Sequence, residues 1–290
     1  MLRKLQHALT LKLDGTPASE RTVTRKRATL NNVVEYAIEV GLLYTNPLPK
    51  LRQRSFGTDR QVDPRVVVSG EQGRRLLAAV ADNTPHLTAY FALLLCAGMR
   101  PAEARSIRRD DLQLPADGWG RATLSRTEQR PGTAWTDSES ATEQRGLKHR
   151  PRSAVRMVPL RPGLVEILKT HLADFPCGFN GELFVSRTGR AGVPLSPPYH
   201  SLVSDKSIYR AWANAREHAL TPTQSLTELG RRPYDLRHAC LTAWLNAGVP
   251  PAQVAVWAGH STRVLLDVYA GCIDGGEDAA MALIDSLSDS

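Results

Sequence analysis

The apolar stretch from Pro85 to Ala97 constrains the fold more than any other part of this 290-residue sequence. A helix that is apolar on every side has to be buried inside a domain. Its longest apolar run, from Tyr90 to Ala97, is far shorter than the roughly 20 residues that cross a bilayer. Gly98 then predicts a turn, and Pro101 opens a further helix at the position where proline is best tolerated. We therefore expect a globular domain built around this stretch, with no membrane partner.

The remainder of this domain is predicted to be mainly helical with one small antiparallel sheet. Ser69, with Gln72 three residues later, forms the capping-box pattern of a helix over 69–81. Apolar spacing predicts further helices at 101–107, 162–173, 205–219, 233–247, 250–258 and 262–270. Alternating segments predict strands at 119–126 and 153–160 and a short one at 182–186. The 127–152 segment is long for a hairpin loop, so it is either mobile or functional.

A separate, smaller element is predicted at the N-terminus. Apolar residues recur at helical spacing from Thr22 to Gly41, with Thr22 as the N-cap and Gly41 as the end. No earlier helix is expected. The 50–65 segment is basic, poor in apolar residues and broken by Gly57 and Pro64, so it is predicted to be a linker. The expected domains are therefore residues 1–65 and residues 66–290.

The composition favours a polyanionic partner without identifying one. The chain has 37 Lys and Arg against 29 Asp and Glu, and its pI is about 9.6. Its four cysteines, at positions 96, 177, 240 and 272, are widely spaced and form no CxxC pair, which indicates reduced thiols rather than a zinc site or disulfides. No signal-peptide core follows the basic 1–13 segment. We expect a cytoplasmic protein.

Four short segments stand out because they combine arginine, lysine, histidine and tyrosine in a fixed order. They are Cys96-Ala-Gly-Met-Arg100-Pro-Ala-Glu103; Gly146-Leu-Lys148-His-Arg, followed by Arg156-Met-Val-Pro-Leu160; Pro233-Tyr234-Asp-Leu-Arg237-His238; and Trp257-Ala-Gly-His260-Ser, with Tyr269 nine residues after His260.

Taken singly, each segment has a purely structural explanation. Arg100 fits an ion pair at the start of a helix, and Lys148 fits a solvated basic loop. Arg237 fits a surface ion pair, and His260 fits a capping or core histidine. Tyr269 fits a half-buried core tyrosine among aliphatic neighbours. No single segment therefore identifies a function.

Taken together, the segments closely resemble the tyrosine recombinases, also called phage-type integrases. The Gly-Met-Arg-x-x-Glu box, the Leu-Arg-His box, the Gly-His-Ser box and the following tyrosine match that family in order, from about Ser69 to Asp274. The stretches Tyr-Asp-Leu-Arg-His-Ala-Cys and Trp-Leu-Asn-Ala-Gly-Val-Pro-Pro resemble integrases of mobile elements from high-GC Gram-positive bacteria in particular. The resemblance implies a mainly α catalytic domain with a small antiparallel β-sheet (α+β) at 66–290, preceded by a partial helical core-binding domain at 1–65.

The resemblance also implies site-specific cutting and rejoining of DNA through a 3′-phosphotyrosine on Tyr269, with no metal, cofactor or ATP. Guanidinium groups stay charged and grip two phosphate oxygens at once, which is the role implied for Arg100 and Arg237. His260 is expected to donate a hydrogen bond to the phosphate or to orient it. Lys148 is expected to protonate the departing 5′ oxygen.

One departure from the family pattern concerns the proton of the nucleophile. Many relatives have a histidine three positions before Arg237, where this chain has Tyr234. Tyrosine can donate a hydrogen bond to phosphate, but it is a poor proton acceptor near neutral pH. Tyr234 is therefore expected to contact the phosphate, and the identity of the base stays open. His238, Asp235 and Glu103 are expected to support the residues that contact the phosphate.

The other departure is at the N-terminus, where only about 60 residues precede the predicted catalytic domain. Relatives carry a full helical core-binding domain there, so this chain is expected to have a truncated one. Three functions stay open: an active recombinase, a DNA-binding remnant with little activity, and a relaxing enzyme of the type IB topoisomerase kind. For the first, the resemblance implies double-stranded DNA sites at the bacterial nucleoid, a homotetramer and a possible accessory directionality factor. The basic segments 21–27, 52–65 and 145–161 are candidates for phosphate contact or for solvated surface.

Overall fold

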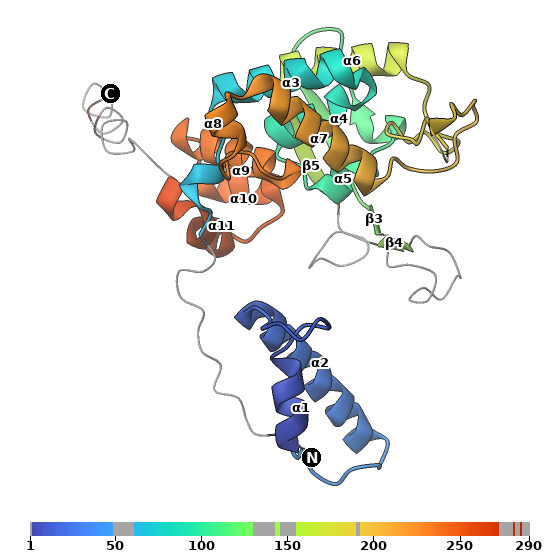
Figure 1. Ribbon diagram of the computed structural model, residues 1–290. Helices are drawn as coiled ribbons and strands as arrows, with labels where there is room; N and C mark the ends of the chain where they lie inside the picture. Colours follow the sequence, from blue (N-terminus) through green and yellow to red (C-terminus); the bar gives the residue numbers. More distant parts are fainter. Residues whose placement is uncertain are drawn as a thin grey trace. The chain divides into compact units, whose positions relative to one another are not determined.

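The computed structural model describes residues 2–48, 61–129, 143–145, 155–189, 192–272, 281 and 285 (Figure 1). The chain divides into two compact units, Met1–Phe56 and Gly57–Ser290. Among these described residues, no helix combines the length and the apolar composition needed to cross a membrane.

The described part of the first unit, residues 2–48, contains two helices, α1 (Leu2–Leu9) and α2 (Glu20–Glu39). The predicted helix is present as α2, but its N-cap is Ser19, whose hydroxyl accepts a hydrogen bond from the Thr22 N–H at 3.3 Å. Thr22 lies inside the first turn, so its prediction as the cap was wrong. The expectation of no earlier helix was also wrong. An eight-residue helix such as α1 is shorter than the window over which apolar periodicity becomes visible.

The centre of the second unit is α4 (Thr88–Ala97), which corresponds to the apolar stretch of the sequence. Eight of its ten residues are buried. It packs against α3 (Gly70–Asn83), α6 (Pro162–Asp174) and α9 (Pro233–Asn246), and Figure 1 shows these helices gathered around it. The predicted burial is therefore confirmed, and α3 also begins at the predicted capping box of Ser69 and Gln72.

The other helical elements of the second unit that lie wholly within the described residues are η1 (Pro64–Val66), η2 (Pro85–Leu87), α5 (Pro101–Arg105), η3 (Arg109–Asp111), α7 (Asp205–Ala219), α8 (Pro222–Ser225), α10 (Pro251–Ala258), α11 (Thr262–Tyr269) and η6 (Ala270–Cys272). Five α-helices, α5, α6, α8, α9 and α10, start with proline. The first helical position suits proline because its backbone nitrogen needs no partner there. Four of these helices were predicted from the sequence, α10 with its start one residue early at Pro250, whereas α8 was not predicted.

The sheet of this unit has three antiparallel strands in the order β1-β2-β5. They are β1 (Leu112–Gln113), β2 (Gly120–Leu124) and β5 (Arg156–Leu160). Two further strands, β3 (Thr127–Gln129) and β4 (Glu143–Arg145), pair with each other as a separate hairpin stem. The small antiparallel sheet is confirmed, although the two-residue β1 was not predicted.

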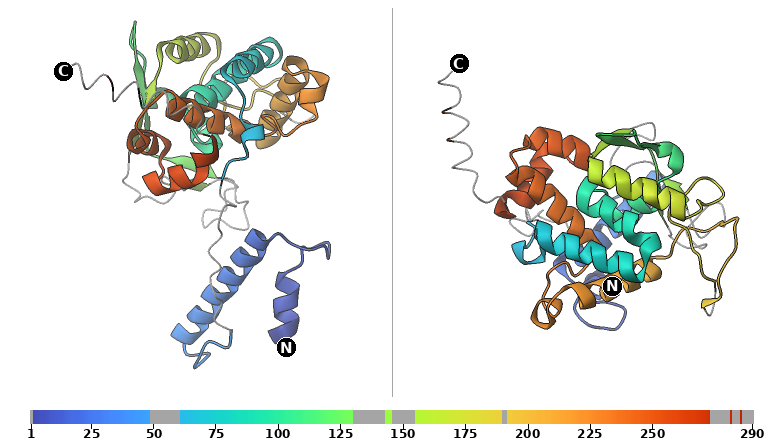
Figure 2. Two further views of the ribbon diagram at one scale, coloured as in Figure 1. Left: turned by 90° about the vertical axis from the view of Figure 1, so that its left-hand side faces the viewer. Right: turned by 90° about the horizontal axis from the view of Figure 1, so that it is seen from above.

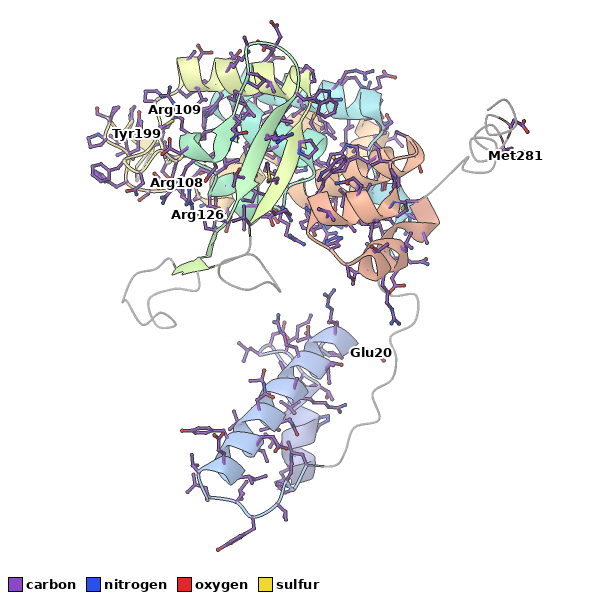
Figure 3. All side chains as sticks on the ribbon, turned by 180° about the vertical axis from the view of Figure 1, so that it is seen from behind. Glu20, Arg108, Arg109, Arg126, Tyr199 and Met281 are labelled. Carbon is purple, nitrogen blue, oxygen red and sulfur yellow. The ribbon has the colours of Figure 1, made fainter. Side chains whose placement is uncertain are left out.

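The segment predicted as a strand at 182–186 is not one. It makes only isolated bridges, from Glu182 to Arg108 and from Val185 to Leu202. Its apolar residues are buried, and its backbone bonds go to loops and not to a neighbouring strand. Arg108, labelled in Figure 3, also forms an ion pair with Glu182 at 3.1 Å. The alternating pattern therefore marked a core-filling extended segment without a pairing partner.

The end of the predicted linker is part of the second unit. Val62 is 7% exposed, and its N–H donates to the Val268 carbonyl at 2.8 Å. Val62 belongs to a second apolar cluster formed mainly by α9, α10 and α11. The right-hand view of Figure 2 shows α10 and α11 at one end of this unit and the 176–204 segment at the other. The chain from Gln61 onward therefore lies against α11, the helix that ends in Tyr269. This contact begins before residue 66, where the second domain was predicted to start.

Candidate active site

Arg100 lies at the junction of α4 and α5 and is held from both sides. Its Nη1 donates to Glu103 Oε1 and its Nη2 to the Gly259 carbonyl, both at 2.8 Å. Glu103 Oε2 also accepts from the Arg100 N–H at 2.8 Å, which caps the first turn of α5. The Arg100 side chain keeps 17% of its surface exposed. Its guanidinium is thus fixed in direction and still open on one edge.

Arg237, on α9, is held by the ends of two other helices. Its Nη1 donates to the Gly98 carbonyl, and its Nη2 donates to the Ala258 carbonyl at 2.7 Å. Gly98 and Gly259 end α4 and α10 in the left-handed conformation. Carbonyls at a helix C-terminus have no partner inside the helix and carry partial negative charge. They are therefore natural acceptors for a guanidinium that has no exposed surface.

A third guanidinium, that of Arg156 on β5, joins this site; from the sequence it was expected only as part of the basic segment 145–161 that could contact phosphate. Its Nη2 donates to Glu103 Oε2 at 2.6 Å and its Nη1 to the Ala258 carbonyl at 2.8 Å. Arg156, Val158 and Leu160 are the inward-facing residues of the strand. An arginine at an inward position of an alternating strand was the available signal, because a buried charge needs a partner.

The charges of this cluster do not balance among the described residues. Burial acts to raise the pKa of Glu103, but Arg156, Arg100 and Arg237 outweigh it and the pKa is lowered. Burial lowers the pKa of Arg156 to about 10, so this group still carries its charge at neutral pH. Three guanidinium groups therefore share one carboxylate. The surplus positive charge makes the site suited to an anion.

His260, between α10 and α11, is linked to Arg237. Its Nε2 lies 3.1 Å from Arg237 Nη2. Burial first, then Arg237 and Arg100, lower the pKa of His260 to about 3, so the ring is uncharged at neutral pH. Since an arginine can only donate, Nε2 is the acceptor and Nδ1 carries the hydrogen. That Nδ1 is buried and has no hydrogen-bond partner among the described residues, which leaves a donor available.

Tyr269 ends α11 and has no exposed surface. Its hydroxyl lies 2.9 Å from Nδ1 of His238 on α9. Burial raises the pKa of Tyr269, although the charges of Arg237 and Arg100 act in the opposite direction. Tyr234, one turn before His238, packs edge-on against the His238 ring with centroids 5.0 Å apart. The hydroxyl therefore sits in a small aromatic group beside the guanidinium cluster.

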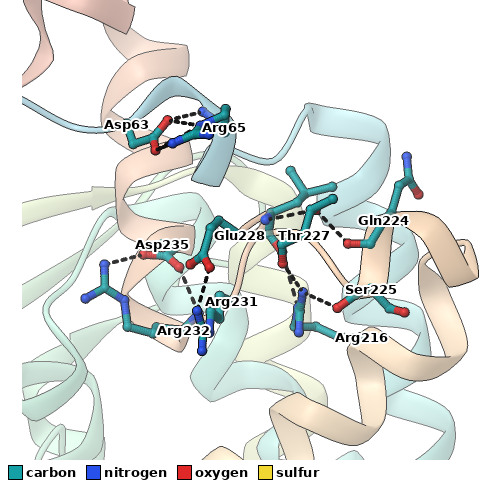
Figure 4. A network of polar contacts seen from close by, with 11 residues as sticks. Asp63, Arg65, Arg216, Gln224, Ser225, Thr227, Glu228, Arg231, Arg232 and Asp235 are labelled. Atoms are coloured by element: carbon teal, nitrogen blue, oxygen red, sulfur yellow. Dashed lines mark hydrogen bonds and ion pairs between the residues drawn. The ribbon is translucent and has the colours of Figure 1, made fainter.

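Asp235 lies in the first turn of α9, two residues before Arg237. Its Oδ2 accepts from the Arg232 N–H at 2.8 Å, and its Oδ1 lies 3.2 Å from Arg232 Nη2. Figure 4 shows this pair within a wider polar network at the start of α9, which also includes the Glu228 and Arg231 pair. Asp235 thus caps α9 and fixes where the helix begins. Lys148 lies outside the described residues, so its role stays a prediction.

The guanidinium groups of Arg156 and Arg100 leave no room for a side chain at Gly259. It has φ +66°, and a Cβ there would collide with Arg156 Nη1 and lie 3.1 Å from Arg100 Nη1. Gly259→Ala is therefore expected to displace both side chains and to lower the free energy of unfolding by more than left-handed backbone strain alone, about 1–2 kcal/mol. Gly248→Ala is the matched control, since Gly248 has φ +80° and open space around it. Equal losses in urea titrations of the two variants would contradict the collision.

Residues 67–271 match the family model described as the phage integrase family. The chain belongs to this family. The match includes every described residue of the guanidinium cluster together with His238, His260 and Tyr269. It confirms the resemblance to the tyrosine recombinases and makes the chain a member of a family of site-specific DNA recombinases, while the finer resemblance to integrases from high-GC Gram-positive bacteria stays a prediction.

Two integrase-fold structures are similar along nearly the whole chain. The Tn1549 transposon integrase, residues 82–397 in complex with circular intermediate DNA, has 17% identity and a TM-score of 0.63, covering 99% of this chain and 83% of that one. The XerH site-specific recombinase, bound to palindromic difH substrate in a post-cleavage complex, has 16% identity and a TM-score of 0.59, covering 96% of this chain and 71% of that one. Comparison with curated protein sequences finds no match. At these identities the two structures support the fold.

The predicted integrase residues fall into two groups in the structure. Arg100 bonds directly to Glu103, and Arg237 bonds directly to His260. Arg156 links these two pairs, because it donates to Glu103 and to the Ala258 carbonyl that also accepts from Arg237. The predicted nucleophile Tyr269 joins them through the adjacent residues 237 and 238 of α9. The sequence did not predict that Arg156 bonds to Glu103 within the guanidinium cluster. It also did not predict that His238 contacts the Tyr269 hydroxyl directly.

Proposed function

We propose that this integrase is a site-specific recombinase that cuts and rejoins DNA through a 3′-phosphotyrosine on Tyr269. The observation that carries the proposal is the position of the Tyr269 hydroxyl beside a guanidinium cluster with surplus positive charge. Attack on a phosphodiester builds negative charge on the phosphate, and fixed donors in a site with little water stabilise that charge strongly. The covalent intermediate keeps the energy of the broken bond, so rejoining needs no ATP.

The chain's own residues supply the chemistry in this proposal. Arg100, with its exposed edge, and Arg237 neutralise the non-bridging phosphate oxygens. The unpartnered Nδ1–H of His260 donates a third hydrogen bond to the phosphate. Lys148 protonates the departing 5′ oxygen. Since the fixed positive charges do the work that a metal would otherwise do, the reaction is expected to be independent of divalent cations.

The proposed partner is double-stranded DNA carrying the recombination sites of a phage or other integrative element. The two solved structures cited above are DNA complexes, which supports this class of partner. On α2, Arg21 and Arg25 are exposed and offer charges for phosphate contact. Contacts of that kind supply most non-specific affinity and weaken steeply with salt. We propose that the recombining assembly is a homotetramer on two duplexes, with an accessory protein setting direction.

Covalent trapping tests this function. The full chain is incubated with nicked duplexes taken from the DNA that flanks its gene, with EDTA present, and SDS-stable adducts are measured. We expect an adduct on wild-type protein that persists in EDTA and is missing from Tyr269→Phe. Peptide mapping of the adduct is expected to locate the nucleotide on Tyr269. Because Tyr269 is fully buried, the adduct should form slowly unless DNA binding first uncovers the hydroxyl.

The result that contradicts the proposal is DNA binding without any adduct across the flanking sequences. That outcome would favour a DNA-binding remnant. Adducts together with relaxation of supercoiled DNA that lacks any specific site would instead favour a relaxing enzyme. Strand exchange between two duplexes that both carry the flanking site is the outcome expected of a recombinase.

A further inference from the structure

The hydroxyl of Tyr269 is in direct contact with the imidazole ring of His238. The Tyr269 hydroxyl oxygen lies 2.9 Å from His238 Nδ1, and the two ring centroids are 5.6 Å apart. His238 directly follows Arg237 on α9 and is partly buried. The surroundings of the nucleophile are therefore set by an imidazole rather than by solvent.

The charge states give this contact a direction. Burial first, then Arg237 and Arg232, lower the pKa of His238 to about 4, so its ring is uncharged at neutral pH. An uncharged imidazole has one nitrogen that accepts a hydrogen bond. Burial keeps the Tyr269 phenol protonated. The arrangement that uses both groups has the Tyr269 O–H donating to His238 Nδ1.

Other nearby groups are already engaged elsewhere or are unsuited to take this proton. His260 uses its Nε2 lone pair on Arg237. The Asp235 carboxylate is occupied by Arg232. Tyr234 stands at the position where relatives have a histidine, but a phenol accepts protons poorly at neutral pH. Its ring lies edge-on to His238 and helps to hold the imidazole in place.

We propose that His238 is the general base that takes the proton of Tyr269 when the tyrosine attacks DNA. This inference rests on the proposed function of Tyr269 as nucleophile. The phenol oxygen forms its bond to phosphorus while its proton moves to His238 Nδ1. The bond from phosphorus to the 5′ oxygen breaks, and that oxygen takes a proton from Lys148. Rejoining reverses each transfer, with His238 returning the proton to Tyr269.

The base is weak before DNA binds, and the bound phosphate strengthens it. The charged and titratable groups around His238 are Arg232, Arg237, Tyr234 and Tyr269. A phosphate on Arg237 offsets the positive charge that disfavours protonated His238. The phenol also becomes more acidic as its oxygen bonds to phosphorus. A positioned base of this kind contributes roughly 100- to 10,000-fold in rate.

The test compares His238→Asn with His238→Ala. The Asn side-chain oxygen lies close to where Nδ1 was, so it accepts the tyrosine hydrogen bond but takes up no proton. Single-turnover adduct formation is measured at saturating protein, with DNA affinity and thermal unfolding recorded for each variant. We expect both variants to lose about 100-fold or more in rate while binding DNA as wild type does. His218→Asn is the matched control, because His218 is exposed on α7, and it should leave the rate unchanged.

A second DNA substrate distinguishes removal of the Tyr269 proton from protonation of the departing 5′ oxygen. With sulfur in place of the bridging 5′ oxygen, the leaving group departs without a proton. We expect His238→Asn to stay slow on this substrate, whereas Lys148→Ala should recover. A rate for His238→Asn within about threefold of wild type on the ordinary substrate, or recovery of that variant on the sulfur substrate, would overturn the inference and leave the proposed function standing. If wild-type protein forms no adduct, the proposed function itself falls, and the inference with it.

Discussion

Arg237→Lys is expected to lower the rate of covalent adduct formation by about 100- to 1000-fold, the usual cost of one preorganised donor. The Arg237 guanidinium spans the Gly98 carbonyl, the Ala258 carbonyl and His260 Nε2 at the same time. A lysine ammonium is a single point charge and cannot hold these directions together. Arg237→Lys keeps the positive charge but loses the directions of the guanidinium hydrogen bonds, so the fall in rate measures the contribution of those directions.

Arg263→Lys is the control for this substitution. Arg263 lies on α11, is 91% exposed and is 3.9 Å from Asp267. The same chemical change there is expected to leave the rate within about twofold, since exposed ion pairs contribute little. The two variants are compared by their single-turnover rates at saturating protein. Thermal unfolding of each variant checks that it is folded. A folded Arg237→Lys protein that keeps more than a tenth of the wild-type rate would contradict the proposed role.

Glu103→Gln is expected to destabilise the folded protein by about 3–5 kcal/mol, the range for removing one partner of a buried ion pair. Glu103 and Arg156 are each 1% exposed and 2.6 Å apart, and Arg100 bonds to the same carboxylate. Without that carboxylate, Arg156 and Arg237 remain as buried like charges. Urea titration monitored by tryptophan fluorescence measures the loss.

The matched control is Glu166→Gln on α6, where the carboxylate is 66% exposed and pairs with Lys169 at 2.9 Å. Its loss should be about 0–1 kcal/mol, as for other surface pairs. Since the pKa of Glu103 is lowered from its ordinary value of 4.5, the stability it contributes is present above that pH and is lost as the pH falls through the folded-state pKa. Wild-type stability should therefore fall below about pH 4.5 more steeply than that of Glu103→Gln. Equal pH slopes would mean that Glu103 does not hold the cluster together.

The sequence was sufficient wherever local chemistry decides the structure. The uniformly apolar α4 had to be buried, and the Ser69 and Gln72 pair had to start α3. Proline at the first helical position marked several helix starts. The predictions from sequence were wrong where the local pattern was too short to detect or where two residues were both suited to the same position. The eight residues of α1 carry too little periodicity, and Ser19 capped α2 in place of Thr22. The alternating 182–186 segment had a strand's pattern but no partner strand.

The sequence by itself determined the family, the order of the candidate catalytic residues and the helical frame that carries them. Only the tertiary structure decided how those residues are connected. The carbonyls at the ends of α4 and α10 accept from guanidinium groups far away in sequence, and spacing along the chain cannot reveal such contacts. Arg156 enters the cluster because β5 turns that face toward Glu103. His238 meets Tyr269 because α9 and α11 contribute to the same apolar cluster, and this contact is the basis for proposing His238 as the base that the motif pattern left unassigned.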